Sequence, residues 1–418
     1  MFRLYTMKVL VSAYACSPNM GSEPGMGWNW CVNLAKHCEL HIITEGEFRD
    51  KIEEMVPTLV QGVNMHFYYL PLTEKVRRMC WNQGDWRFYY YYRKWQKKTL
   101  ETARKICEDE DIDILHQLNM IGFREPGYLW KISQETGIPF VWGPVDAKES
   151  FPMAYAAEAP WKTRLFLRLK NGITRWQLRY NRRVKEAVRT SAALLSASSN
   201  SVYSFKKYFG IDSPLFNETG LSITQGHRNK KTKNSFDILW VGKSDFRKQL
   251  SLALKAIKTA MKGDLLFHIV GIVDELYKKE ADKLCISDHC VFHGAISHDE
   301  VFNIMNQADV LLFTSVAEGT PHVVLEAISC GLPIICFKTC GQGDCVTDDI
   351  GIKIPLTNPA QSAIYFSEAI EYLYNHRNAL VAMSQNCQQR AEELSWENKA
   401  QKMVLLYEEV LKKNAKAV

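Results

Sequence analysis

The hydrophobic positions in the first half of the chain come in short runs that alternate with segments of helical periodicity. Between residues 8 and 199 we expect six buried strands: KVLVSAY, LHIITE, MHFYYLP, DILHQLN, PFVWGPV and AALLSASS. The second half resumes the alternation at FDILWVG and continues it through LLFHIVG, CVFHGA, ADVLLFTS and PIICF. Strands that alternate with helices favour parallel sheets, so the pattern predicts an α/β fold with two doubly wound, Rossmann-like domains.

A polar, loop-rich segment separates the two halves. It runs from about residue 211 to 235 and ends in a run of charges, which is typical of a connection between domains. We therefore predict a first domain over residues 1–215, a second over 216–393, and a terminal helix over 394–418 that could pack on either domain.

The stretch VAEGTPHVVLEAISCGLP, residues 316–333, holds two glutamates eight positions apart. Thr320 is a suitable N-cap and Pro321 a suitable first helical residue, so a short helix is expected from Pro321 to about Cys330. Glu318 then lies in the loop after a strand, and Glu326 lies one turn past His322. In an open parallel sheet ligands bind at this edge, where a helix N-terminus offers free N–H groups to an anion.

Other candidate binding residues follow strands in both domains. Gly242, Lys243 and Lys248 follow FDILWV, and the two lysines could neutralise a diphosphate or be solvated surface charges. GKS within this segment is not a P-loop, because Asp237 stands where that motif requires a glycine. In the first domain Gly21, Gly25 and Gly27 form a loop whose backbone could approach a ligand closely, or simply a tight turn.

One histidine also lies near the carboxyl end of a predicted strand. His116 lies near the end of DILHQLN, where it could reach the cleft or be a satisfied structural histidine. The nearby Asp111-Ile112-Asp113 precedes its strand, so it is expected at the opposite edge, away from ligands.

Charge is concentrated in one helix. The net charge of the 418-residue chain is only +6, but residues 161–190 contain ten Lys/Arg and one acid. Leu165, Leu169, Ile173, Trp176 and Tyr180 recur there at helical spacing, beside a stripe that includes Arg168, Arg175 and Arg179. Such a helix could face an anionic membrane, or its apolar stripe could pack in the core. Because no nucleic-acid motif accompanies the charge, nucleic acid is not an expected partner.

Composition argues against membrane-spanning, secreted and metal-binding proteins. Apolar runs fall well short of the ~20 residues that a membrane-spanning helix needs, and the first residues do not resemble a signal sequence, so a cytoplasmic location is expected. The twelve cysteines show no metal-ligand spacing, and no metal or other cofactor is expected.

Together these residues resemble the retaining glycosyltransferases of family 4, which have the two-domain GT-B fold. Glu318 and Glu326 match the E-x7-E motif, and Lys243 and Lys248 stand where the family has an Arg and a Lys. The resemblance implies that Glu318 holds the donor sugar, Glu326 the nucleotide ribose, and the lysines with the Gly319, Thr320, Pro321 and His322 backbone the diphosphate. By the family pattern, His116 corresponds to the histidine region near the donor sugar, and the terminal helix crosses back to the first domain.

The implied function is metal-independent transfer of a sugar from a nucleotide-sugar donor to a saccharide or lipid-linked acceptor, in synthesis of a surface polysaccharide such as lipopolysaccharide. The same fold also serves nucleotide-sugar epimerases and sugar phosphorylases, and a catalytically silent scaffold is a further alternative.

Overall fold

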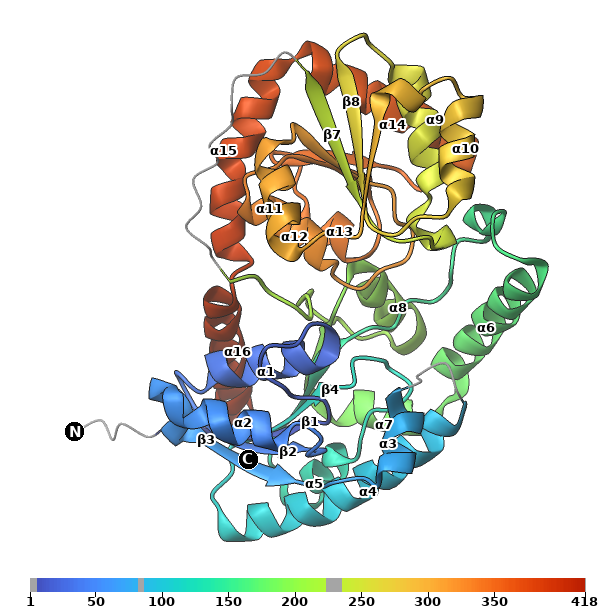
Figure 1. Cartoon of the computed structure of the whole chain (residues 1–418). Coiled ribbons are helices and arrows are strands. Elements are labelled where there is room, and N and C mark those ends of the chain that lie inside the picture. Colours follow the sequence, from blue (N-terminus) through green and yellow to red (C-terminus); the bar gives the residue numbers. More distant parts are fainter. Residues whose placement is uncertain (1–5, 82–85, 223–234, 418) are drawn as a thin grey trace.

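The computed structural model describes residues 6–81, 86–222 and 235–417. It contains two six-stranded parallel sheets, one in each half of the chain, with helices on both faces (Figure 1). The predicted α/β architecture of two doubly wound domains is therefore confirmed. No helix within these described ranges combines the length and the apolar character needed to cross a bilayer.

The first sheet has the strand order β3-β2-β1-β4-β5-β6. Its strands are β1 Lys8–Ala13, β2 Glu39–Thr44, β3 Met65–Tyr69, β4 Ile114–Asn119, β5 Phe140–Val145 and β6 Ser191–Ser196. Its helices are α1 Ser22–Leu34, α2 Arg49–Met55, α3 Glu74–Trp81, α4 Trp86–Asp109, α5 Leu129–Thr136, α6 Trp161–Tyr180, α7 Arg182–Thr190 and α8 Ser199–Phe209. Two hydrophobic clusters cover the two faces of the sheet, which explains why its central strands carry apolar residues on both faces, although β4 also buries His116, Gln117 and Asn119.

The second sheet has the order β12-β11-β10-β7-β8-β9. Its strands are β7 Phe236–Val241, β8 Leu265–Val270, β9 Cys290–Gly294, β10 Val310–Phe313, β11 Ile334–Phe337 and β12 Gly351–Ile354. Its helices are α9 Leu250–Ala260, α10 Glu275–Lys283, α11 His298–Gln307, α12 His322–Ser329, α13 Cys340–Cys345, α14 Pro359–Asn375 and α15 Arg377–Glu393. The strand order reverses between β7 and β10, and a crevice for a ligand is expected at their carboxyl ends.

The terminal helix α16, Trp396–Ala417, crosses back to the first domain, where it runs beside α1 (Figure 1). Trp396 packs edge-on against Trp30 with ring centroids 5.5 Å apart, and Tyr407 and Met403 lie in the same buried cluster as α1. The side chain of Lys399 is buried at this junction and donates to the Asn217 carbonyl at 2.6 Å. Burial lowers the pKa of Lys399 to about 8.

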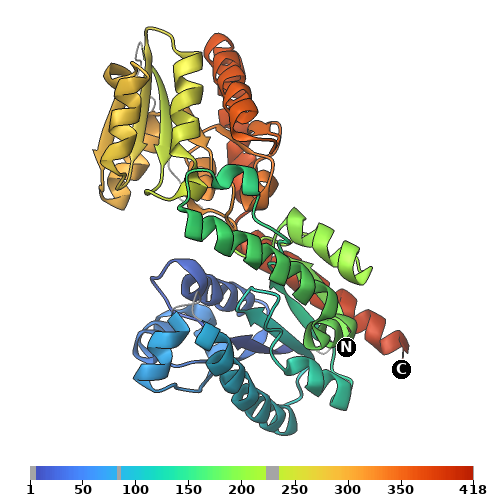
Figure 2. The same cartoon turned by 90° about the vertical axis from the view of Figure 1, so that its right-hand side faces the viewer.

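Helix α6 lies between the two domains, on the face turned toward the viewer in Figure 2. A polar seam attaches it: Asn171 exchanges hydrogen bonds with the Phe151 backbone, and Arg124 donates to Thr174 and Gln177. The apolar stripe points the other way, with Leu165, Leu169, Ile173, Trp176 and Tyr180 between 49% and 61% exposed. The alternative that this stripe packs in the core is therefore wrong.

Candidate functional site

The centre of the site is an ion pair at the carboxyl edge of the second sheet. Lys248 Nζ lies 2.7 Å from Glu318 Oε1, and both side chains are about four-fifths buried. The Ser315 hydroxyl also donates to Glu318 Oε1, at 2.6 Å. Lys248 comes from the segment after β7 and Glu318 from the loop after β10, so the strand reversal brings these predicted residues together.

The backbone around Lys248 is held firmly. A 3-10 turn over Phe246–Lys248 ends at Gln249, whose φ of 53° is left-handed although it is not a glycine. The Gln249 amide donates to the Phe246 and Tyr155 carbonyls, and Thr314 Oγ1 donates to the Lys248 carbonyl at 2.7 Å. Such strain persists only where the surroundings enforce it, and here it accompanies a turn whose backbone is held in place at Lys248.

Two more cations come from the same segment after β7. Lys243 is exposed, and the exposed Arg247 donates to both carboxylate oxygens of Asp245. Burial alone would raise the pKa of Asp245, but the hydrogen bonds from Arg247 outweigh it and lower that pKa. Arg247 was not predicted as a site residue. It carries a guanidinium, which Lys243 does not, and the only sequence signal for it is its place between Lys243 and Lys248, in the segment DFRK.

The helix after Glu318 begins one residue later than predicted. Pro321 is the N-cap of α12, and the Thr320 hydroxyl makes no capping bond. Instead the Thr320 N–H and Oγ1 donate to the carboxylate of Glu218, at 2.5 and 2.7 Å. The Thr320 N–H, predicted to face a diphosphate, is thus occupied in this conformation. Gly331, with φ of 67°, follows the predicted helix end at Cys330.

Glu218 belongs to the connection between the domains and is 7% exposed. Burial raises its pKa, and the hydrogen bonds from Thr320 act in the opposite direction. A Cβ at Gly319 would come within 2.4 Å of Glu218 Oε1, so a side chain there would displace the Glu218 carboxylate from its present position. A Cβ at Gly242 would likewise lie 2.6 Å from the Trp240 ring.

Glu326 faces an interdomain cavity of about 330 Å³. His322 and His298 line it from the second domain, and Gly21, Ser22 and Gly25 line it from the first. His298 Nε2 lies 3.1 Å from Glu326 Oε1 and is a second residue that sequence reasoning missed. Nothing in the local sequence marks it, because α11 and α12 meet only in the folded chain.

Two residues that were predicted to belong to the site, His116 and Gly27, lie outside it. His116 is fully buried, with Nε2 2.6 Å from the Gly143 carbonyl and Nδ1 2.6 Å from the Tyr407 hydroxyl. A carbonyl can only accept, so Nε2 carries the proton and Nδ1 accepts from Tyr407. Burial lowers the pKa of His116 to about 4, while the bond to Gly143 acts in the opposite direction. The prediction that His116 reaches the cleft is wrong.

Gly27 lies inside α1, because the helix begins at Ser22. It is buried, and a Cβ there would come within 2.3 Å of the Ala15 carbonyl oxygen. Because Gly27 has no side chain, α1 can pack closely on the end of β1, and the prediction that Gly27 belongs to a loop that approaches a ligand is wrong.

The first domain contributes its own cavity and several hydrogen bonds to the second domain. A cavity of about 210 Å³ is lined by side chains that include Tyr14, Glu23, Glu45, Glu47 and Trp81.

Lys148 of the first domain donates to the carbonyl of Val316 at 3.2 Å, two residues before Glu318. The first domain therefore contacts the loop that carries the central carboxylate.

Residues 224–392 match the family model described as glycosyl transferases group 1. The chain resembles the GT-B glycosyltransferases. Sulfoquinovosyl transferase SQD2 of Arabidopsis thaliana is 30% identical over 146 residues, which are 34% of this chain and 27% of that protein. The chain spans less than half the length of the curated relatives it matches.

Solved structures agree on the fold over the whole chain. The Anabaena protein HepE, solved with UDP and glucose, has a TM-score of 0.56 at 14% identity, covering 96% of this chain and all of HepE. The lipopolysaccharide outer core galactosyltransferase WaaB has a TM-score of 0.59 at 15% identity, covering 96% of this chain and 99% of its own. The GT-B resemblance expected from Glu318 and Glu326 is confirmed.

Proposed function

We propose that this chain is a retaining glycosyltransferase that moves a sugar from a nucleotide-sugar donor to a saccharide or lipid-linked saccharide in polysaccharide synthesis. The observation that carries the proposal is the Lys248–Glu318 pair at 2.7 Å, placed at the strand reversal of the second sheet and facing the first domain. A diphosphate needs cations, and a sugar needs acceptors for its hydroxyls. The pair supplies both within one contact.

The donor would lie along the second-domain edge. Lys243, Lys248 and the unpredicted Arg247 would neutralise the diphosphate, whose charge grows as the glycosidic bond breaks. Glu318 would accept hydrogen bonds from the sugar, and Glu326 from the ribose. Fixed cations around the leaving group lower the barrier without a metal, so the proposal needs none. Glu318 is not assigned as a nucleophile, because one loop and one helix supply the acids from the same side.

The acceptor would enter from the first domain. Its cavity is polar at Glu45 and Glu47 and apolar at Tyr14 and Trp81, which suits a sugar whose hydroxyls and ring faces both need contacts. Glu45 is buried and accepts from Arg77 and from the Leu72 and Glu47 N–H groups, so it holds the cavity wall in place, and the partly buried Glu47 would be the acid that meets a sugar hydroxyl.

A panel of nucleotides tests the donor. UDP is the first ligand to try, because the structural neighbour HepE was solved with UDP and with UDP-glucose. Thermal unfolding is measured with UDP, GDP, ADP and their sugar conjugates. One nucleotide should raise Tm of the wild type, since a ligand of the native state stabilises it. Glu326→Ala should reduce that rise. No rise with any nucleotide would contradict the proposal.

We further propose that α6 places the enzyme on an anionic membrane surface from the cytoplasmic side, where a lipid-linked acceptor would be available. About 100° per residue separates the side chains of a helix, which puts the apolar stripe opposite the Asn171–Thr174–Leu178 seam and the arginines between them. Each cation near an anionic surface contributes about 1 kcal/mol.

Vesicle sedimentation tests this surface. Arg168→Gln with Arg179→Gln should weaken binding to anionic vesicles by roughly 10- to 30-fold, since two cations are removed. Trp176→Ser should weaken it as well. Arg189→Gln, a matched change on α7, should have little effect. Equal sedimentation of all variants would refute the membrane role of α6 and leave the donor site untouched.

A further inference from the structure

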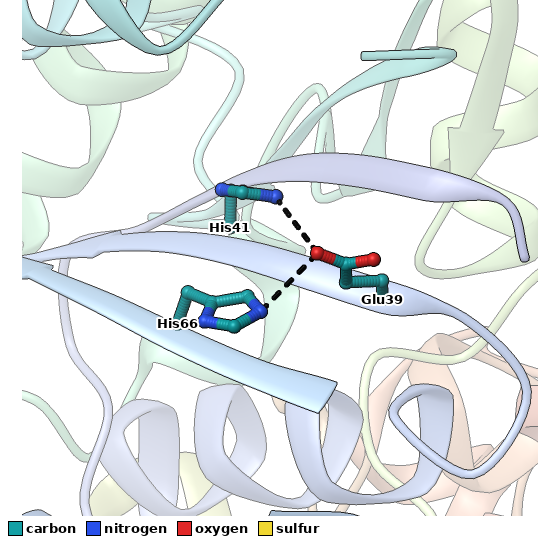
Figure 3. Close-up of side chains that lie close together, drawn as sticks. All are labelled: Glu39, His41 and His66. Atoms are coloured by element: carbon teal, nitrogen blue, oxygen red, sulfur yellow. Dashed lines mark ion pairs between the residues drawn. The ribbon is translucent and has the colours of Figure 1, made fainter. Parts of the chain in front are cut away.

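A cluster of three potential metal ligands lies at the amino edge of the first sheet, remote from the proposed donor site. Glu39 and His41 are two residues apart on β2, so both side chains lie on the same face of the strand. His66 on β3 pairs directly with His41 in the parallel register and therefore joins them on that face. Figure 3 shows both imidazoles turned toward the Glu39 carboxylate.

The two distances from the carboxylate to the imidazoles are close to those of a tetrahedral metal site. Glu39 Oε1 lies 3.2 Å from His66 Nε2 and 3.5 Å from His41 Nε2, and one potential ligand atom of each residue lies within 4.8 Å of the others. Zinc bonds of 2.0–2.1 Å in a tetrahedron put ligand atoms roughly 3.3 Å apart. Small side-chain adjustments would therefore suffice to bring the three atoms onto one ion.

A second observation points into the same space. His41 is 2% exposed, and its Nε2 is fully buried with no hydrogen-bond partner. The other nitrogen, Nδ1, lies 3.0 Å from the Tyr68 hydroxyl. If Nδ1–H donates to Tyr68, the Nε2 lone pair faces Glu39 and is available to a metal. A metal-binding histidine ordinarily has such a partner for its second nitrogen.

We propose that Glu39, His41 and His66 bind one zinc ion that fastens the edge strand β3 to β2. Two imidazoles and a carboxylate suit zinc, with water in the fourth position, better than they suit calcium or magnesium, which prefer oxygen ligands. The sequence did not indicate the site, because 24 residues separate His41 from His66 until the strands pair.

One resident cation competes for the carboxylate. Lys8 Nζ is 3.7 Å from Glu39 Oε1 but only 2.5 Å from Glu110 Oε2, so its closer partner is Glu110. Glu39 therefore retains an oxygen for the ion. The site lies at the opposite end of β2 from Thr44 and Glu45, which line the first-domain cavity about 17 Å away along the strand. The proposed ion takes no part in sugar transfer.

The test uses metal alone on the full chain. After chelation and desalting, ZnCl₂ is titrated into wild type, His66→Gln, Glu39→Gln and Tyr68→Phe, with His376→Gln as the control at an exposed histidine. Binding is followed by calorimetry and by Tm. Wild type and His376→Gln should bind one Zn²⁺, and Mg²⁺ should not replace it. His66→Gln and Glu39→Gln should lose about 100-fold or more in affinity, and Tyr68→Phe about 10-fold.

Two results would overturn the proposal. One is a wild type that binds no Zn²⁺ at about 50 µM, roughly a thousand-fold above the dissociation constant that a binding free energy of about 10 kcal/mol gives. The other is equal binding by wild type and His66→Gln, which would assign the ion to cysteines or surface histidines. His66 is exposed, so its substitution should leave the fold intact, and the unfolding curve of His66→Gln without metal checks this.

Discussion

The buried His116 makes the stability of the protein depend on pH. Its pKa is about 4 in the folded chain and about 6.5 when exposed, so the unfolded state binds more protons between these values. Stability contributed by the neutral ring is complete above pH 6.5 and is lost as pH falls toward 4. At about 1.36 kcal/mol per pH unit, the difference amounts to about 3 kcal/mol.

The perturbation is His116→Gln, since a glutamine can donate to Gly143 and accept from Tyr407 but does not titrate. Urea unfolding is measured at half-unit steps from pH 7 to pH 4.5. The wild type should lose about 2–3 kcal/mol more than the variant over this range. Nucleotide binding at pH 7 should be the same in both proteins.

The reasoning would be refuted by parallel pH profiles in the two proteins, which would mean that His116 is not buried as a neutral ring. A large loss of nucleotide affinity in a folded His116→Gln would restore its predicted role in the cleft.

Two further substitutions, each with a control, probe the donor site and the packing of α1. Lys248→Met should weaken binding of the nucleotide by about 10- to 100-fold and also destabilise the fold, because Glu318 loses its buried partner; the exposed Lys243→Met should weaken binding without loss of stability, as titration calorimetry and thermal unfolding would show. Gly27→Ala should cost about 1–3 kcal/mol in urea unfolding, because its Cβ meets a backbone oxygen at 2.3 Å. Gly172→Ala, in open space on α6, should instead be neutral or stabilising.

The strands were predictable because parallel sheets covered on both faces require apolar runs, and the chain carries them in a repeated order. The same order predicts that Glu318 and Lys248 lie at one sheet edge. Periodicity also identified α6 but could not decide whether its apolar stripe was covered. The exposure of the stripe follows from the polar contacts of Asn171 and Thr174, which attach the other face of α6 to the protein.

The errors share a physical cause. Thr320 is a good N-cap in isolation, but Glu218, 102 residues earlier in the chain, takes its hydroxyl and N–H. His116 stands near a strand end, yet α16 returns from the far end of the chain to bury it. His298, likewise, becomes a site residue only through the approach of α11 to Glu326. Each case depends on a long-range contact that local pattern does not contain.

The central claim is that the second-domain edge binds the nucleotide of a sugar donor through Glu326 and the cations around Glu318. Calorimetric titration of the nucleotide found in the panel, expected to be UDP, tests it most directly with wild type, Glu326→Gln and the exposed control Glu368→Gln. The account predicts one site in wild type and control, and affinity about 10-fold or more lower in Glu326→Gln. Equal affinity in all three proteins, or no binding by the wild type, would contradict it.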